Sequence, residues 1–226
     1  MIDSRIKAVM NFVRAGSCVV DVGADHGYLS IELVKSGRAS KVIATEKNLH
    51  PFEAAVKNIS AAGFDDKIDV RLGDGLQVLT AGEVDTICIA GMGGALITKI
   101  LDDSPEVVQS ARQLILQPMN GIKKIREWLA ENNWTIIDED LAESAGIIYE
   151  IICAEKNSVP KIFKRETSPL KEKFLTQRLE KLEKVISEMS KSPVVRSSEK
   201  FLALQAEINS INERIYSRHS NSISPM

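Results

Sequence analysis

One short loop brings together the residue types most suited to chemistry. Asp25, His26 and Tyr28 place a carboxylate, an imidazole and a phenol within four residues of one another. The loop follows an apolar run at residues 18–22 and precedes a helical pattern at residues 29–36. A strand, a Gly-containing turn and a helix in that order are typical of nucleotide-binding α/β units, where backbone and a helix N-terminus face the ligand.

A second carboxylate indicates what kind of ligand this loop binds. A further apolar run, residues 41–45, ends at Glu46, 25 residues after Asp21, where a carboxylate can accept from both ribose hydroxyls of an adenosine. The turn holds Gly23, Gly27 and an aspartate where a dinucleotide would put its pyrophosphate. Because like charges repel, the loop favours S-adenosyl-L-methionine, which carries a sulfonium and an ammonium, over NAD. A glycine turn that only reverses the chain is the alternative.

The same loop suits methyl transfer to a ring nitrogen. Displacement at the sulfonium carbon is in line, so an enzyme mainly aligns a lone pair with that carbon. Adenine N1 is already a nucleophile, but its exocyclic amine must be held and its cationic product stabilised or deprotonated. We assign that role to Asp25, with His26 beside it and Tyr28 orienting or stacking the base. The alternative is that His26 and Tyr28 only pack the turn.

The end of the third apolar run supplies a candidate for adenine recognition. Asp74 and Gly75 follow residues 68–72. At this turn a carboxylate can accept from the adenine amine, and the glycine can supply a backbone donor. An ordinary Asp-Gly turn is the alternative.

Two later turns are expected on the same side of the sheet. Residues 89–94, which include Ala90, Gly91 and Met92, lack the Asn/Asp-Pro-Pro-aromatic turn of enzymes that methylate exocyclic amines. Their small side chains let a flat group approach, although the glycines also suit the plain start of a helix. Gln117 and Pro118 are candidates for contact with a substrate base.

The pattern around these turns predicts the fold. Aliphatic runs at residues 18–22, 41–45, 68–72, 84–90 and 113–117 alternate with helical patterns at residues 29–36, 51–62, 94–101 and 122–131. That alternation indicates an α/β fold with a parallel, doubly wound sheet. Two more strands, residues 134–141 and 147–154, form the terminal hairpin expected of a seven-stranded, Rossmann-like class I methyltransferase.

The C-terminal region has a different pattern. Two heptad-spaced stripes flank Ser192 and Pro193: Leu175, Leu179, Leu182, Ile186 and Met189, then Phe201, Leu204, Ile208, Ile211 and Ile215. They predict an antiparallel coiled-coil hairpin, so we divide the chain into a catalytic domain, residues 1–157, and a helical extension, residues 158–226. Residues 156–226 hold 14 Lys and Arg against 8 Asp and Glu. This excess of positive charge suits binding to a polyanion; the alternative is that the lysines only keep a solvated helical hairpin soluble.

Composition excludes several classes. No apolar run approaches the length of a membrane span, and the first residues lack the apolar segment of a signal peptide. Cys18, Cys88 and Cys153 stand in apolar runs as buried thiols, and no metal-ligand spacing occurs. We therefore expect a cytoplasmic protein with no metal.

The ordered motifs together resemble a known family. VDVGADHGYL (20–29), GDG (73–75), IAGMGG (89–94), LILQP (114–118) and IYEI (148–151) are similar to the bacterial tRNA (adenine-N1)-methyltransferases that modify adenosine 22. The resemblance implies a cofactor site of Asp21, Gly23, Ala24, Glu46, Asp74, Gly75, Ala90, Gly91 and Met92, and a methyl-transfer site of Asp25, His26 and Tyr28. It also suggests Arg5 opposite the cofactor carboxylate. Relatives often have Ser at Ala24 and Pro at Ser30.

The resulting prediction is a monomeric or weakly dimeric tRNA methyltransferase that uses S-adenosyl-L-methionine. Its extension would contact the tRNA backbone through Lys171, Lys173, Arg178, Lys181 and Lys184. One alternative is a small-molecule methyltransferase whose coiled coil is a dimerisation element. A non-catalytic cofactor- or RNA-binding module is another, and an NAD-linked oxidoreductase is the least favoured.

Overall fold

The structure is a computed structural model that describes residues 3–160, 163–191 and 198–221. The chain divides into two compact units, Met1–Ser168 and Pro169–Met226. The division falls later than the boundary at residue 157 expected from the sequence, because a short helix that follows the last strand belongs to the first unit.

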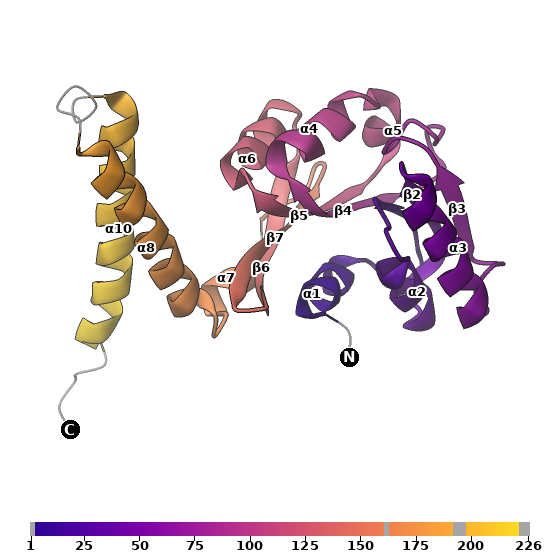
Figure 1. The fold of residues 1–226 in the computed structure, drawn as a ribbon, viewed down its shortest axis with the longest axis horizontal. Helices are drawn as coiled ribbons and strands as arrows, with labels where there is room; N and C mark the ends of the chain where they lie inside the picture. Colours follow the sequence, from indigo (N-terminus) through magenta and orange to yellow (C-terminus); the bar gives the residue numbers. More distant parts are fainter. Residues whose placement is uncertain (1–2, 161–162, 192–197, 222–226) are drawn as a thin grey trace. The chain divides into compact units, whose positions relative to one another are not determined.

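A single seven-stranded sheet forms the centre of the first unit (Figure 1). Its strands are β1 (Ser17–Val22), β2 (Ala39–Glu46), β3 (Ile68–Leu72), β4 (Thr86–Gly93), β5 (Gln113–Asn120), β6 (Thr135–Ser144) and β7 (Ile147–Glu155). Their order is β3-β2-β1-β4-β5-β7-β6. The first five are parallel, and β7 is antiparallel to both β5 and β6. The α/β prediction and the terminal hairpin are confirmed.

Helices cover both faces of this sheet. They are α1 (Ser4–Phe12), α2 (Tyr28–Lys35), α3 (Leu49–Ala62), α4 (Gly94–Asp102), α5 (Pro105–Ser110), α6 (Ile122–Glu131) and α7 (Lys164–Thr167). Apolar side chains of α1, α2 and α3 pack in one core with one face of the sheet, and those of α4, α5 and α6 pack in another. Val19 and Val20 of β1 enter opposite cores because successive strand side chains point to opposite faces.

Sequence patterns missed three helices, α1, α5 and α7. Two of them, α5 and α7, have only six and four residues, although α5 has the start signal of Ser104 as N-cap and Pro105 in its first turn. In α1, Asp3 is the N-cap, and its side chain accepts from the backbone N–H of Arg5. These helices depend on packing rather than on length for their stability.

The second unit is a pair of helices, α8 (Lys171–Met189) and α10 (Glu199–Asn221), which lie side by side and run in opposite directions (Figure 1). Leu175, Leu182 and Ile211 are buried between them, with members of both predicted stripes packed around. The predicted turn at Ser192 and Pro193 lies outside the described residues. Within the described part of the chain, no helix has both the length and the apolarity to cross a bilayer.

Candidate active site

A cavity of about 740 Å³ opens at the carboxyl ends of β1 and β4. Its walls come from α1, the loop between β1 and α2, α2 itself, and the ends of β4 and β5. The lining residues are Asp3, Arg5, Ile6, Val9, Asp21, Gly23, Ala24, Asp25, His26, Tyr28, Leu29, Glu32, Lys35, Ala90, Gly91 and Gln117. β1 and β4 are neighbours at the point where the strand order reverses, which is where open α/β sheets bind ligands.

The loop after β1 is fixed by its backbone. The N–H groups of Gly23 and Ala24 both donate to the carbonyl of Thr45, at 2.8 and 3.0 Å. Gly23 has a φ of +72°, a conformation that glycine adopts without strain. Asp25 follows with a φ of +51°, which is uncommon for a residue with a side chain. Strain of this kind persists only where the surroundings over-determine it, and it clusters at functional sites.

Asp21 is the buried carboxylate of the cavity wall. Ser30 Oγ donates to Asp21 Oδ2 at 2.7 Å, and both side chains are buried. Burial raises the pKa of Asp21 to about 6, and the hydrogen bond from Ser30 opposes that rise. A carboxylate in such a place is stabilised by a cationic ligand.

Asp25, His26 and Tyr28 lie together on the exposed side of the loop. The side chains of Asp25 and His26 are 68% and 49% exposed, and Tyr28 is 57% exposed. His26 Nε2 lies 3.8 Å from Asp25 Oδ1, and the rings of His26 and Tyr28 have centroids 5.6 Å apart. Three residues that the sequence grouped therefore line one cavity with side chains open to an incoming molecule.

Glu46 supports the loop from β2. Its Oε2 accepts from the Asp25 N–H at 3.3 Å, and its Oε1 accepts from the Asn48 N–H at 2.9 Å. The residue is buried and lies outside the cavity lining. Each oxygen keeps further acceptor capacity, so its predicted role toward ribose hydroxyls stays a prediction.

Four other predicted residues also lie outside the cavity lining. Asp74 is exposed and accepts from Lys47 Nζ at 2.6 Å, and Gly75 packs against Ile100. Met92 is half-buried against the core, and Pro118 is buried. The predicted contact of the buried Pro118 with a substrate base stays a prediction.

Gln117 has a supporting contact that the sequence did not reveal. Its side chain lines the cavity but is 1% exposed. Oε1 accepts from the Gly91 N–H at 3.1 Å, and Nε2 donates to the Pro118 carbonyl at 3.1 Å. The amide thus holds the end of β4 in place, and a direct contact with substrate stays a prediction.

The sequence patterns missed the N-terminal helix α1, although the family resemblance named Arg5, which lies on this helix and lines the cavity. The predicted place of Arg5 opposite the cofactor carboxylate stays a prediction. Arg5 pairs with Asp3 at 3.0 Å and lies over the ring of Tyr149, 5.1 Å from its centroid. Ser144 Oγ donates to Asp3 Oδ2 at 2.9 Å, which ties the start of α1 to the end of β6. The available signal was Asp3 as an N-cap before apolar residues at helical spacing, Ile6 and Val9.

The remaining predicted groups lie elsewhere. Lys171, Lys173, Arg178, Lys181 and Lys184 all belong to α8 in the second unit. Arg178 pairs with Glu207 of α10 at 2.7 Å. Cys88 and Cys153 are buried and Cys18 is half-buried, all as free thiols. No group of three or more His, Cys, Asp or Glu in the described ranges is arranged to hold a metal.

Comparison with known proteins identifies the family. The profile of the family described as "Methyltransferase domain" matches residues 2–152. A Streptococcus pneumoniae protein solved in complex with S-adenosyl-L-methionine is 35% identical, with 95% of this chain and 100% of that chain covered and a TM-score of 0.81. The M1A22 tRNA methyltransferase TrmK of Bacillus subtilis is 30% identical in its crystal structure, with 96% of each chain covered and a TM-score of 0.77. The chain belongs to the tRNA (adenine(22)-N(1))-methyltransferase family.

The amino-acid sequence of a curated relative supports the same family. The tRNA (adenine(22)-N(1))-methyltransferase of Bacillus subtilis strain 168 is 40% identical over 154 residues, which are 68% of this chain. The matched region spans 65% of that relative's length. Family membership therefore agrees with the sheet order and with the position of the cavity.

Proposed function

We propose that this protein transfers a methyl group from S-adenosyl-L-methionine to N1 of adenosine 22 in the D-arm of tRNA. One observation carries the proposal: a single cavity joins the buried carboxylate of Asp21 to the exposed group Asp25, His26 and Tyr28. The buried end suits a cationic cofactor, and the exposed end suits a nucleobase.

The residues present fit this cofactor. Among the described residues, the contact of the Asp21 carboxylate is a neutral hydroxyl, that of Ser30, and not a cation. An ammonium or sulfonium group of the cofactor can therefore balance its negative charge. Gly23 and Gly91 have positive φ angles and no side chain, so a ligand can approach their backbone closely. Glu46 ends β2 and Asp74 lies just after β3, and we propose that these two carboxylates accept from the adenosine of the cofactor. The cofactor contributes the electrophilic methyl carbon.

The chain's own groups then orient the base. Tyr28 presents an exposed ring on which an extruded adenine can stack, and extrusion is required because N1 is paired or stacked in a folded RNA. Asp25 lies on the same loop and accepts from the exocyclic amine. Its carboxylate stabilises the cationic product or takes a proton from it, with His26 as the adjacent group.

The helical extension is the proposed contact with the tRNA backbone. Lys173, Lys181 and Lys184 are exposed on α8, where they suit phosphate groups. Arg178 pairs with Glu207 of α10, so part of its charge is neutralised within the extension. A tRNA substrate implies a cytoplasmic enzyme, and a monomeric or weakly dimeric state remains a prediction for mass measurement in solution.

The test is methyl transfer to a defined tRNA. Unmodified tRNA is incubated with methyl-labelled S-adenosyl-L-methionine, and the methylated nucleoside is mapped; we expect label at N1 of adenosine 22. A transcript with guanosine at position 22 is the matched control and should stay unlabelled. Label at another position would reject the site, and an unlabelled tRNA together with turnover of a small acceptor would favour a small-molecule methyltransferase.

A further inference from the structure

A cluster of four charged residues lies away from the cavity, with one of them fully buried and the other three partly exposed. Glu139 of β6 is 0% exposed and forms ion pairs with Arg126 of α6 and, at 3.2 Å, with Arg165 of α7. Glu150 of β7 joins the two arginines: its Oε2 accepts from Arg165 Nη1 at 2.8 Å and from Arg126 Nη2 at 3.4 Å. We call these four residues the charge cluster.

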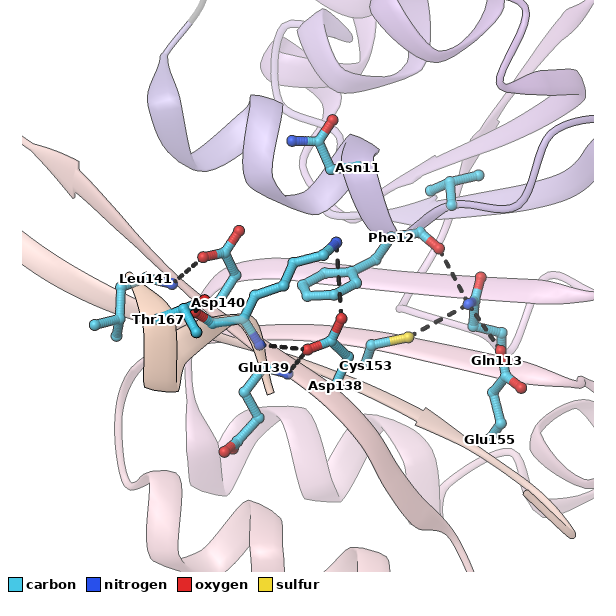
Figure 2. A network of polar contacts seen from close by, with 12 residues as sticks. Asn11, Phe12, Gln113, Asp138, Glu139, Asp140, Leu141, Cys153, Glu155 and Thr167 are labelled. Carbon is cyan, nitrogen blue, oxygen red and sulfur yellow. Dashed lines mark hydrogen bonds and ion pairs between the residues drawn. The ribbon is translucent and has the colours of Figure 1, made fainter. Parts of the chain in front are cut away.

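The residue before Arg165 has a separate set of contacts. The backbone N–H of Lys164 donates to Asp138 Oδ1 at 2.8 Å, and Lys164 Nζ lies 3.7 Å from Asp138 Oδ2. The same ammonium lies 4.5 Å from the centroid of the Phe12 ring, at the end of α1. Figure 2 shows Asp138 and Phe12 close together beside this part of the chain. Two consecutive residues of α7 are therefore held by β6, β7 and α1.

Stability alone does not account for this arrangement. Burial raises the pKa of Glu139 even though two arginines oppose the rise, so removal from water outweighs the attraction. Buried ion pairs are often no more stabilising than apolar residues of the same size, and their best-attested use is to specify one geometry. Here the specified element is α7, a four-residue helix that is too short to hold its place without such contacts.

The helix α7 lies immediately before the second unit in the chain. The helix ends at Thr167, and the second unit begins at Pro169. The second unit, which is the part of the extension that carries α8 and α10, therefore continues directly from the residues that the charge cluster holds. The other end of the same contact set reaches α1, whose residues line the cavity.

We propose that Arg165, Lys164 and Glu139 are positioning residues for the tRNA substrate. They fix the point at which the chain leaves the catalytic unit, from which the extension that binds tRNA continues. The inference rests on the proposed function, because it requires the extension to bind tRNA. No contact of these three residues with cofactor or base is involved.

The test compares two arginines of one cluster. Arg165→Met removes the ion pairs that hold α7 to Glu139 and Glu150. Arg126→Met removes ion pairs with the same two carboxylates but leaves Arg165 on both of them. We expect Arg165→Met to raise the KM for tRNA by about tenfold. The dissociation constant for S-adenosyl-L-methionine and the kcat at saturating tRNA should stay within about twofold of wild type. The matched control Arg126→Met should lower the melting temperature but leave the KM for tRNA unchanged.

Two further variants keep the test decisive. Lys164→Met alters a half-exposed side chain, so it should fold and should raise the KM for tRNA as well. Arg165→Lys retains one charge and should restore part of the loss. An equal rise in KM for Arg126→Met and Arg165→Met would overturn the proposal, since loosening of the fold would then explain both. An unchanged KM in Lys164→Met would also overturn it.

A separate variant distinguishes failure of the positioning role from failure of the extension to bind tRNA. Charge reversal of Lys173, Lys181 and Lys184 to Glu acts on the extension itself. If that variant leaves the KM for tRNA unchanged, the extension does not bind tRNA and the positioning role is rejected, whereas the proposed methyl transfer is judged separately by the label at adenosine 22. If it raises the KM while the α7 variants do not, only the positioning role is rejected.

Discussion

Ser30 Oγ donates a 2.7 Å hydrogen bond to Asp21 Oδ2 inside the wall of the cavity, where neither side chain reaches bulk water. The bond favours the ionised carboxylate, but burial dominates and holds the pKa of Asp21 near 6. The folded protein therefore binds the proton more tightly than the unfolded chain, in which an aspartate has a pKa of about 4. Between these values, the contribution of Asp21 to folding stability falls as the pH rises.

The affinity for S-adenosyl-L-methionine should depend on the charge of Asp21. Because the cofactor carries a sulfonium and an ammonium, it should bind the ionised carboxylate more tightly. We expect the affinity to rise by up to about tenfold per pH unit below pH 6 and to level off above about pH 7. Calorimetric titrations at several pH values in two buffers would measure both the affinity and the proton released.

Asp21→Asn provides the control for that pH dependence. The amide keeps the size of the side chain and can still accept from Ser30, but it does not titrate. The affinity of this variant should be lower than that of wild type at pH 8 and nearly constant between pH 5 and pH 8. Parallel pH curves for the two proteins would assign the effect to another group.

Asp25→Ala should separate cofactor binding from methyl transfer. The carboxylate of Asp25 is exposed, and none of the described hydrogen bonds that hold the loop ends on it. The loop is held to Glu46 by the backbone N–H of Asp25 instead. We expect cofactor affinity within about twofold of wild type and a loss of methyl transfer of about 100-fold or more. Equilibrium binding and single-turnover assays with tRNA would measure the two effects, and near-normal turnover would remove Asp25 from the chemistry.

Reversing the charges of Lys173, Lys181 and Lys184 should weaken tRNA binding and change its salt dependence. For every phosphate that the extension no longer neutralises, the slope of log affinity against log salt becomes shallower by about 0.7–0.9. A titration across salt concentrations should therefore show both a weaker affinity and a shallower slope.

The same number of charges can be reversed on the catalytic unit. Lys41, Lys57 and Lys67 are exposed and lie outside the cavity lining. Their reversal to Glu changes net charge equally and should leave most of the salt slope intact. Equal losses of affinity in the two triple variants would show that overall charge, rather than the extension, attracts tRNA.

Gly23→Ala and Gly37→Ala form a matched pair of loop variants. The two glycines have φ angles of +72° and +71°, so an added side chain strains both by about 1 kcal/mol. At Gly23 a Cβ would also meet Met92 Cε, the flexible end of its side chain, whereas at Gly37 nothing lies within 4 Å.

Only one member of this pair should affect the cofactor. Urea unfolding should show similar small losses of stability in the two variants. Calorimetry should show a loss of cofactor affinity of about tenfold or more for Gly23→Ala alone, because Gly23 lines the cavity. Equal cofactor affinities in the two variants would mean that the ligand does not approach Gly23.

Local patterns in the sequence were enough to predict the strands of the sheet and the grouping of residues in the loop after β1. The aliphatic runs at β1, β2, β3, β4 and β5 predicted strands because a buried parallel strand needs apolar residues on both faces. The grouping of Asp25, His26 and Tyr28 followed from adjacency within one turn. The stripes of α8 and α10 were equally readable, since a two-helix core repeats at heptad spacing.

Only the tertiary structure decided which residues share the cavity and which charged residues meet around α7. Ile6 and Val9 of α1 line the cavity because that helix packs beside α2, a relation between segments that no spacing along the chain encodes. Glu139 lies between Asp138 and Asp140 in β6, at the edge of the sheet, yet it is fully buried. Its partners Arg126 and Arg165 come from helices on either side of it in the sequence. A charge is buried when distant groups converge on it, and convergence is a property of the folded chain rather than of any local pattern.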